Sequence, residues 1–462
     1  MSAEVEEFDA IIVGARIAGC ATAIALAQRG LRVLAVDSAR FGSDTLSTHL
    51  LWPTTVAEVQ ALGALPAVSA TGAPRMPIAE ATLDDIGWRT VYSAVAGIDY
   101  ALCVRRTHLD RILVDTATAA GADLRDRCTA TGLVERAGRI AGVIFTDGDD
   151  NTHEVHAPIV VGADGRRSFV AERVGVRTPT LAAPSGRACY YAYWKDHRTD
   201  LRHIASQWRT GRLLGTAFPC DGGGLLSLLQ PPADLAPDFR GRRAHDAYLA
   251  GIESLPGLAR RLDGCEMVST VRSCTGIESY FRRSSGPGWA LPGDSGHFKD
   301  PVTAQGIRDG LRYGRLLGEA IAPVLGARDG VDLDALDRAT ATWAADRERG
   351  CIEVYQWTNF LAAGSEPSPL EYELYMQAQQ RPDFAHTLSD IYNRVRPPSA
   401  MMPMNTLLGA VTHALRNPDH PSREVVDDLR FQQRRMVGEW RERRRFLRPT
   451  DGRLPRSVSS QK

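Results

Sequence analysis

The first residues that could do chemistry are small ones, spaced around a turn near the N-terminus. The run over residues 8–30 reads FDAIIVGARIAGCATAIALAQRG, with Gly14 ending an apolar stretch and Gly19 near the start of a helix-favouring one. This arrangement lets a helix N-terminus aim its free N–H groups at a pyrophosphate. Arg16 replaces the middle glycine of G-x-G-x-x-G, and Asp37 ends the next expected strand, where an acid binds ribose hydroxyls. The pattern predicts a dinucleotide site and leaves open a tight turn without ligand.

Two later segments repeat the order of strand, glycine and acid. Residues 160–175 read VVGADGRRSFVAERVG, and an apolar strand there runs into Asp164-Gly165. Residues 289–310 read WALPGDSGHFKDPVTAQGIRDG, where Gly293-Asp294 follows a short strand and a helix is expected to open at Gly306. Such an aspartate can accept hydrogen bonds from ribose or ribitol hydroxyls. Helix N–H groups can face the flavin edge where negative charge gathers on reduction. Each segment alone would be a turn, whereas all three in this order are specific.

The elements that must position these motifs alternate at the start of the chain. A strand over 9–13, a helix over 18–28 and a strand ending at Asp37 form a β-α-β unit. A β-rich meander is expected over 129–161, and an aromatic-rich set of strands over 187–230. Further helices are expected over 107–120, 244–262, 305–325 and 333–360, and the last hundred residues are helical with proline breaks. This order predicts a nucleotide-binding domain interrupted by a substrate domain.

The composition limits the class of protein. The 462 residues are 44% hydrophobic, enough for two or three packed units, and 55 basic residues balance 55 acidic ones. This neutral balance favours neither nucleic acid nor an acidic membrane as a partner. We interpret the arginine-rich stretch RRMVGEWRERRRFLRP near the C-terminus as a solvated helix face with a basic tail. Glycines 222–224 in DGGG are interpreted as a turn, because no helix pattern follows them.

Cysteine usage and targeting signals predict a cytoplasmic protein. Eight cysteines are scattered without any C-x-x-C pair, so we expect reduced, mostly buried thiols and no metal. The first residues are acidic rather than basic, so no signal peptide is predicted. No apolar run approaches the ~20 residues that a membrane span needs.

Taken together, the motifs resemble those of the group A FAD-dependent monooxygenases, the aromatic-hydroxylase-like flavoproteins. That family carries a G-x-G-x-x-G near the N-terminus, a D-G motif in mid-chain and a later G-D motif. Its R-x-x-L before a helix is present as Arg106-Thr107-His108-Leu109. The resemblance covers about residues 8–360. Two departures weaken inferences about fine flavin contacts: the family's G-x-N is Gly306-Ile307-Arg308, and its later D-A pair is Tyr313-Gly314.

The resemblance implies an α/β fold. A discontinuous Rossmann-like FAD-binding domain would comprise residues 1–75, 100–180 and 265–360. An α+β substrate domain built on a β-sheet would comprise residues 76–99 and 181–264. A helical C-terminal region with its basic tail would follow over 361–462.

The resemblance also implies which residues hold a non-covalent FAD. Gly14 to Gly19 would hold the pyrophosphate and Asp37 the adenosine ribose. Either Arg106 or its neighbour Arg105 would contact the phosphates or ribityl chain. The set is Gly14, Ala15, Arg16, Ala18, Gly19, Asp37, Arg105, Arg106, Asp164, Gly293, Asp294, Pro301, Ala304, Gln305, Gly306 and Ile307. Asp294 would bind the ribityl chain, and the turn from Pro301 to Ile307 would face the isoalloxazine. We hypothesise that Arg16 lies over the phosphates or ribityl chain; the alternative is that it points to solvent.

By the same resemblance the activity is a monooxygenation of a small aromatic or polycyclic substrate in secondary metabolism. Reduced FAD would react with O2 to a C4a-(hydro)peroxide that transfers one oxygen atom. No second Rossmann fingerprint exists, so NAD(P)H would bind only transiently. The alternatives are a reductase or dehydrogenase acting on a C=C or C–C bond, and a non-enzymatic scaffold. A halogenase is disfavoured because the W-x-W-x-I-P motif is absent. Monomer and homodimer both stay open.

The substrate is expected between the 187–230 strands and the flavin. Candidates for the pocket wall are Tyr191, Tyr193 and Trp208, although strand alternation places only about half of the local aromatics on one face. His49, in the loop after the second strand, is a candidate catalytic residue. The alternative is a loop histidine without a catalytic task.

Overall fold

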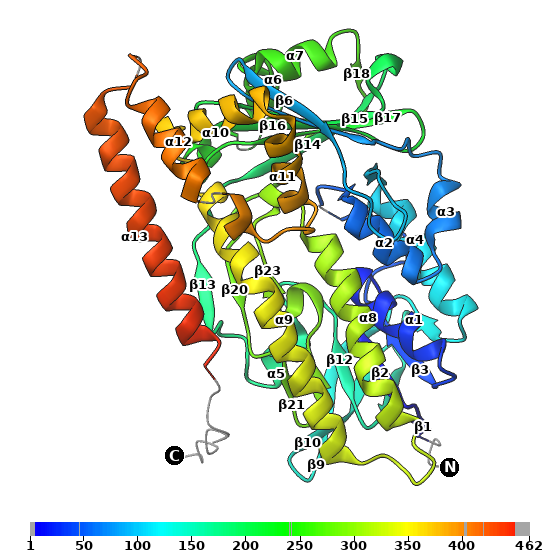
Figure 1. Cartoon of the computed structure of the whole chain (residues 1–462). Coiled ribbons are helices and arrows are strands. Elements are labelled where there is room, and N and C mark those ends of the chain that lie inside the picture. The colour runs from blue at the N-terminus through cyan, green and yellow to red at the C-terminus, as the bar shows by residue number, and fades with distance from the viewer. Residues whose placement is uncertain are drawn as a thin grey trace.

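The structure is a computed structural model of the chain and describes residues 5–448 except 46, 240, 242, 402, 403 and 419. A six-stranded sheet and a larger second sheet lie at opposite ends of an elongated molecule, and long helices run between them (Figure 1). The mixed α/β fold expected from the sequence is confirmed. The final residues of the basic tail lie outside the described part of the chain.

The first sheet has six strands in the order β21-β22-β12-β2-β3-β8. Its centre is the all-apolar, fully buried run β2 (Ala10–Val13), with β3 (Val33–Val36) and β12 (Val160–Gly162) parallel on either side. Strands buried on both faces are typical of parallel sheets covered on each side. The outer strands are β8 (Asp123–Arg125), β22 (Trp289–Ala290) and β21 (Ser285–Gly286).

Helix α1 (Ile17–Ala27) is buried along its whole length between this sheet and α8 (Gly306–Leu325). The close approach depends on glycine. A Cβ at Gly314 would lie 2.5 Å from the carbonyl oxygen of Ala18, and the Gly314 carbonyl accepts a 3.0 Å hydrogen bond from Thr22. The Tyr313-Gly314 pair thus serves helix packing here. Helix α4 (Arg106–Ala119) also packs on α1.

The other face of the sheet is covered by a small meander in the order β1-β11-β10-β9. Its strands are β1 (Glu6–Glu7), β9 (Thr129–Arg136), β10 (Arg139–Thr146) and β11 (Thr152–His156). Val143, Phe145 and Val155 pack here against the outward side chains of β2 and β3. The predicted meander is confirmed.

The second sheet follows the order β18-β14-β17-β16-β15-β5-β6, and β19 also pairs with β14. The strands are β5 (Ile78–Leu83), β6 (Ile86–Val91), β14 (Cys189–Lys195), β15 (Ile204–Thr210), β16 (Leu213–Pro219), β17 (Gly224–Gln230), β18 (Glu266–Met267) and β19 (Arg272–Cys274). Helices α6 (Arg243–Glu253) and α7 (Pro256–Leu262) cover its outer face, seen at the top of Figure 1. The single helix expected over 244–262 is two helices, because Pro256 begins a new one.

Short strands tie the two ends together. The sheet β13-β20-β23 comprises Leu181–Ala183, Ser279–Phe281 and His297–Phe298, and β4 (Leu50–Leu51) pairs with β7 (Leu102–Cys103). Three strand pairings cross the expected domain limits: β14 with β18, β14 with β19, and β13 with β20. β18 and β19 join the second sheet although they follow residue 264, and β13 does not join it. The division into domains therefore stays a proposal.

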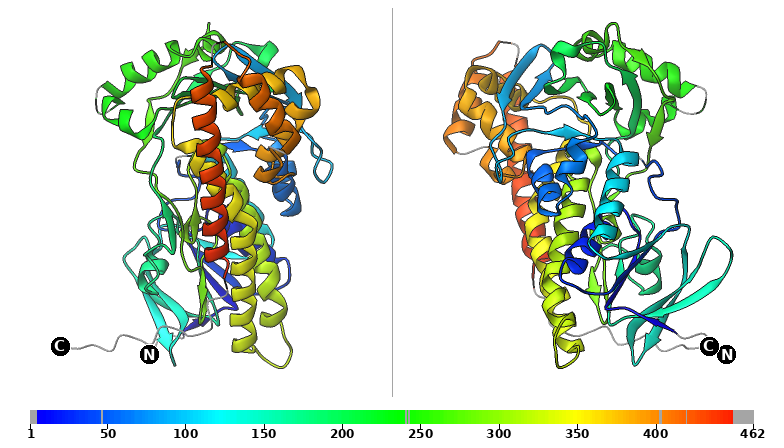
Figure 2. Two further views of the ribbon diagram at one scale, coloured as in Figure 1. Left: turned by 60° about the vertical axis from the view of Figure 1, so that its left-hand side comes forward. Right: turned by 90° about the vertical axis from the view of Figure 1, so that its right-hand side faces the viewer.

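Helices complete the structure. Helix α2 (Pro53–Ala61), α3 (Leu65–Ser69) and α5 (Phe169–Arg173) belong to the first half of the chain. The predicted C-terminal helices are α9 (Leu333–Ala362), α10 (Pro369–Gln380), α11 (Pro382–Tyr392), α12 (Met404–Ala414) and α13 (Ser422–Phe446). Figure 2 shows α13 lying along α9, where Gln356 donates to the Glu439 carbonyl. Helices α10 and α11 pack on β6 of the second sheet. Within the described residues, none of the helices is both long and apolar enough to span a membrane.

Candidate functional site

A large cavity of about 610 Å³ lies where the strands β2, β3 and β12 end and the helices α1 and α8 begin. This position, at the carboxyl ends of parallel strands, is where open α/β sheets bind ligands. The structure brings residues from all three sequence motifs to this one cavity. Of the cofactor residues predicted from the sequence, those that line it are Gly14, Arg16, Ala18, Asp37, Arg106, Asp164, Gly293, Asp294, Pro301, Ala304, Gly306 and Ile307.

The turn between β2 and α1 is shaped by its glycines. Gly14 has a φ of +101°, and a Cβ there would lie 2.5 Å from the Ala163 carbonyl oxygen. A Cβ at Gly19 would lie 1.8 Å from the carbonyl oxygen of Gly14, so only glycine lets the helix begin so close to the strand. Asp37 accepts a 2.9 Å hydrogen bond from the Ala15 N–H. Ala15 and Gly19 therefore shape the cavity from behind rather than line it.

Arg16 is held against the cavity wall. Its guanidinium donates to the Ser43 hydroxyl at 2.9 Å and pairs with Asp110 at 3.2 Å, and its side chain is 30% exposed. Arg106 forms a two-bonded pair with the same Asp110, at 2.8 and 2.9 Å. Two guanidinium groups thus share one carboxylate, which leaves net positive charge at the wall. That charge suits a phosphate or another anion.

The two adjacent arginines have different surroundings. The Arg105 guanidinium donates to Asp221 at 2.7 Å, and the Arg105 backbone N–H donates to the same carboxylate at 2.8 Å. His108 Nδ1 also lies 2.8 Å from Asp221. Arg105 is not among the residues that line the large cavity, whereas Arg106 is. The choice that the sequence left open therefore favours Arg106, and the geometry does not support Arg105 as a cavity residue.

The two aspartates of the later motifs differ in what they bind. Asp164 accepts from the Ser168 hydroxyl at 2.5 Å and from the Val170 N–H at 3.1 Å, so it fixes the start of α5. The Asp294 carboxylate accepts no side-chain or backbone hydrogen bond from the described residues. Burial raises the pKa of Asp294. A desolvated carboxylate at a cavity wall needs donors, and the hydroxyls of a polyol chain would supply them.

The turn before α8 gives the cavity its other end. Ala304 adopts a left-handed conformation with a φ of +52°, and the space beside Gly306 is open, because a Cβ there would meet nothing within 4 Å. The first N–H groups of α8 have no intrahelical partners and carry the positive end of the helix dipole. Gln305 instead points away, because its amide donates to the carbonyls of Thr303 and Tyr392. It holds the turn rather than lining the large cavity.

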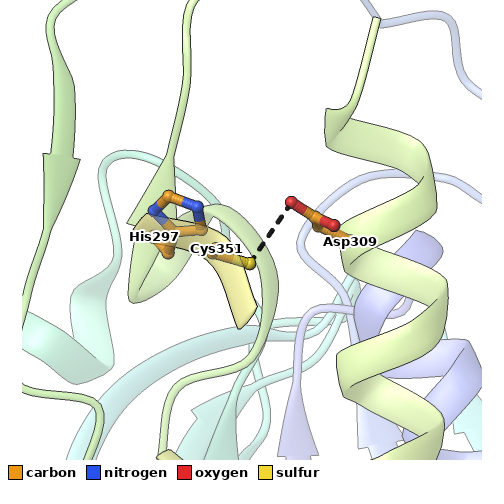
Figure 3. A group of neighbouring side chains, drawn as sticks. All are labelled: His297, Asp309 and Cys351. Atoms are coloured by element: carbon orange, nitrogen blue, oxygen red, sulfur yellow. Dashed lines mark hydrogen bonds between the residues drawn. The ribbon is translucent and has the colours of Figure 1, made fainter. Parts of the chain in front are cut away.

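A buried cluster stands behind this turn (Figure 3). His297, Asp309 and Cys351 place potential ligand atoms within 4.8 Å of one another, and the Cys351 thiol lies 3.7 Å from the Asp309 carboxylate. The Lys299 ammonium, however, donates to both His297 and Asp309. An ammonium therefore already supplies the positive charge that a metal would bring. Burial acts to raise the pKa of Asp309, but Lys299 and two arginines outweigh it and hold that pKa well below its usual range. Lys299 also lines the large cavity.

A second, smaller cavity of about 50 Å³ lies between the inner face of the second sheet and the turn at 301–304. Thr48, Pro301 and Ala304 line both cavities, so the two adjoin there. Aromatic side chains form much of the small cavity's wall: Trp52, Trp88, Tyr92, Phe218 and Tyr392. Residues 88, 92 and 392 carried no sequence motif. They meet here only because α11 packs on β6 of the second sheet.

The predicted pocket aromatics need a correction. Trp208 packs in the core on the outer face of the second sheet, under α7, where a Cβ on Gly257 would lie 2.2 Å from the indole. Strand alternation thus turns Trp208 away from both cavities, and its placement in the substrate pocket is wrong. Tyr191 and Tyr193 lie on the inner face, but both contact His49 rather than line the small cavity.

His49 lies behind the cavities rather than in them. It is fully buried, with a φ of +58°. Its Nδ1 donates to the Ser47 carbonyl at 2.7 Å, so Nε2 accepts from the Tyr193 hydroxyl at 2.8 Å. Burial and the nearby Arg106 charge lower the pKa of His49 to about 3. A neutral imidazole with both nitrogens engaged positions Tyr193 and the loop, while its neighbour Thr48 reaches the cavities.

Comparison with known proteins agrees with this geometry. Residues 7–187 match the family model described as FAD binding domain. The chain is similar to a digeranylgeranylglycerophospholipid reductase of Methanocella arvoryzae, with 26% identity over 72% of this chain and 82% of that one. It is also similar to a 1H-pyrrole-2-carbonyl-[peptidyl-carrier protein] brominase of Pseudoalteromonas luteoviolacea, with 21% identity over 71% of this chain and 80% of the relative.

Among solved structures, the fold is similar to PqsL of Pseudomonas aeruginosa in complex with 2-aminobenzoylacetate. The TM-score is 0.62 at 20% identity, over 83% of this chain and all of that one. This likeness concerns the fold. The family match begins in β1, ends two residues before β14 and includes the first two motifs.

Proposed function

Because this chain is an FAD-dependent oxidoreductase with the fold of the group A flavoprotein monooxygenases, we propose that it oxygenates a small organic substrate, using O2 and NAD(P)H. The observation that carries the proposal is the meeting of two cavities at Thr48, Pro301 and Ala304. One has the shape and donors for a dinucleotide. The other is a small aromatic chamber at the end where the flavin ring would lie.

The residues around the large cavity fit FAD. The turn at Gly14 leaves no room for a side chain, and the Asp294 carboxylate lacks a donor within the described part of the chain. In the proposed arrangement the α1 N-terminus and the Arg16–Arg106 pair hold the phosphates, Asp37 the adenosine ribose and Asp294 the ribityl chain. When bound, FAD supplies the redox chemistry with oxygen.

The protein's own task is then to hold the substrate and exclude water. The small cavity is walled by the second sheet, α11 and the 301–304 turn, so a substrate there is shielded from bulk solvent. The N-terminus of α8 and the buried Lys299 bring positive charge to the same end, which favours the electron-rich reduced flavin. No side chain of the small cavity has to act as a base for oxygen transfer.

A reductase acting on a C=C or C–C bond is the second candidate, favoured by the similarity to the archaeal reductase over 72% of the chain. The long chains of a phospholipid do not match the small cavity, whose volume is about 50 Å³. A reductase of a small substrate would use the same site. Halogenation, by similarity to the brominase, would show itself as a halide requirement.

The test uses the purified holoprotein with its flavin absorbance spectrum. We expect NAD(P)H oxidation that is stimulated by a small aromatic compound, consumes O2 and yields a product heavier by one oxygen atom. Substrate reduction that continues unchanged without air would overturn the proposal in favour of the reductase. A product that carries bromine only when bromide is added would overturn it in favour of a halogenase.

A pair of variants links the activity to the small cavity. Ala205 lines it, so Ala205→Leu should abolish stimulation by the substrate while FAD stays bound. Ala217 packs in the core on the outer face of the same sheet, so Ala217→Leu adds the same volume away from the cavity. This control should keep substrate stimulation. Equal losses in both variants would show that overpacking of the sheet, rather than the cavity, explains the effect.

A further inference from the structure

Five of the buried polar groups that have no hydrogen-bond partner among the described residues line the small cavity, the Gln230 amide nitrogen among them. The Trp88 indole N–H and the hydroxyls of Tyr92, Thr216 and Ser389 have no hydrogen-bond partner in the described part of the chain. All four residues line this cavity. Their side chains are more than nine-tenths buried, with exposures of 7%, 4%, 6% and 1%. Buried polar groups are normally paired, so their gathering around one cavity indicates that a ligand supplies the partners.

These groups converge from separate parts of the fold. Trp88 belongs to β6 and Tyr92 follows it directly, whereas Thr216 lies on β16 and Ser389 on α11. No local sequence pattern brings them together, and none of the four serves a neighbouring element by capping or cross-linking. Retaining four unpaired groups costs stability in each case unless a bound molecule or water satisfies them. Their shared position around one aromatic-walled cavity is the basis for inferring ligand recognition.

The chemistry of the groups limits the ligand. An indole N–H only donates, so Trp88 requires an acceptor oxygen or nitrogen on the bound molecule. The three hydroxyls can donate or accept. The surrounding wall is apolar and aromatic, and Trp52 and Tyr392 lie 5.7 Å apart as tilted rings. A flat ring with polar atoms at its edge would match these walls.

The charge of the wall excludes an anion. The charged residue among those lining the cavity is Glu80, which is already paired with Arg89. No arginine or lysine lines the small cavity within the described residues. A carboxylate placed there would be buried without a counter-charge, which is expensive in free energy, and Glu80 would repel it.

We propose that Trp88 and Tyr92 determine specificity in this cavity by recognising an uncharged aromatic ketone or similar carbonyl-bearing ring, and that the site rejects a carboxylate of the same shape. The indole N–H donates to the carbonyl oxygen, and the hydroxyls of Tyr92, Thr216 and Ser389 bind further polar atoms of the ring. This assignment rests on the proposed function, because it names the substrate class of that site.

The experiment measures binding to the oxidised holoprotein without NAD(P)H, so that it needs no turnover. Three probes of similar size are titrated calorimetrically: acetophenone, ethylbenzene and benzoate. Acetophenone offers one neutral acceptor, ethylbenzene none, and benzoate a negative charge. We expect acetophenone to bind about tenfold more tightly than either of the others, which is the magnitude of one well-placed hydrogen bond. Benzoate binding as tightly as acetophenone would overturn the assignment.

Variants then identify the side chains that bind the carbonyl oxygen of acetophenone. Trp88→Phe keeps an aromatic ring but removes the N–H, and should weaken acetophenone about tenfold while leaving ethylbenzene unchanged. Tyr92→Phe is the second test and should weaken acetophenone in the same selective way. The matched control is Trp208→Phe, which removes an indole N–H on the outer face of the same sheet and should change no probe. Equal weakening of all probes by Trp88→Phe would show a role in shape only and would contradict the proposal.

The two proposals fail in different ways. If the probes bind as expected but no aromatic compound stimulates oxygen-dependent NAD(P)H oxidation, the monooxygenase proposal is wrong. The proposal that Trp88 and Tyr92 recognise an aromatic ketone is then retained. If another aromatic compound stimulates that reaction while acetophenone does not bind better than ethylbenzene, the proposed recognition of a ketone is wrong. The monooxygenase proposal is then retained.

Discussion

Acidification should destabilise this protein through the buried His49. Its imidazole is neutral in the fold, since Nδ1 donates to Ser47 and Nε2 accepts from Tyr193. Burial, together with the Arg106 charge, lowers its pKa to about 3, whereas an unfolded histidine titrates near 6.5. Between these two values the unfolded chain binds a proton that the folded chain does not. Stability is therefore full above pH 6.5 and falls as the pH drops toward 3.

The magnitude follows from the two pKa values. At pH 5 nearly every unfolded chain has a protonated His49, and almost no folded chain does. The resulting loss of unfolding free energy between pH 7.5 and pH 5 is about 2 kcal/mol for this residue alone. Other groups titrate in the same range, so the contribution of His49 has to be isolated by a variant.

The variant is His49→Asn, because asparagine tolerates the left-handed φ of +58° better than most residues. Urea denaturation of wild type and variant is measured at pH 7.5 and at pH 5. The substitution has its own cost, through the lost Tyr193 contact, but that cost is the same at both pH values and cancels. We expect the variant to lose about 2 kcal/mol less than wild type on acidification.

A control and a refuting result complete the design. His197 is exposed, so His197→Gln should leave the pH dependence of stability as it is in wild type. If His49→Asn and wild type lose the same unfolding free energy between pH 7.5 and pH 5, then His49 binds a proton as readily in the folded chain as in the unfolded one. The reasoning from burial and from the Tyr193 bond would then be refuted.

Four further outcomes are expected. Gly14→Ala should lower the unfolding free energy of the apoprotein by about 2 kcal/mol or more in urea, because its φ of +101° and a nearby carbonyl leave no room; an unchanged midpoint would contradict this. Asp110→Asn should cost about 3 kcal/mol in the same assay, since it leaves the buried Arg106 unpaired, and a cost below about 1 kcal/mol would argue against it. Arg16→Ala should weaken FAD about threefold at low salt and less at high salt, whereas no effect at any salt would remove its charge role. Trp208→Ala should lower the unfolding free energy by about 3–5 kcal/mol yet leave acetophenone binding unchanged; altered binding would show that Trp208 contributes to the pocket.

The sequence predicted the nucleotide-binding half of the fold well because its signals are local. Gly14, Gly19 and Asp37 lie within one β-α-β unit, and the geometry of such a unit is determined by neighbouring residues. The later motifs were found for the same reason, since in each a strand is followed within four residues by an aspartate next to a glycine. Their arrival at one cavity follows from the parallel pairing of β12 with β2 and with β22, which aligns the carboxyl ends of the three strands.

Adjacent residues were harder to separate. Arg105 and Arg106 have the same chemistry, and only the tertiary partners, Asp221 for one and Asp110 for the other, show which of them reaches the cavity. Arg16 illustrates the same limit, because the sequence offered phosphate or solvent. The structure adds a third answer, a pair with Asp110 at the cavity wall.

The α/β class, the dinucleotide turn and the acids that follow the buried strands could all be predicted from the residues alone, because they depend on short-range steric and hydrogen-bonding rules. The small cavity could not. Trp88 and Tyr92 are separated from Ser389 by about three hundred positions and carry no spacing pattern, so only the packing of α11 against β6 of the second sheet brings them together. The face of the sheet that Trp208 on β15 and Tyr191 on β14 occupy also depends on tertiary packing, since strand alternation fixes two faces but only packing determines which of them meets the cavity.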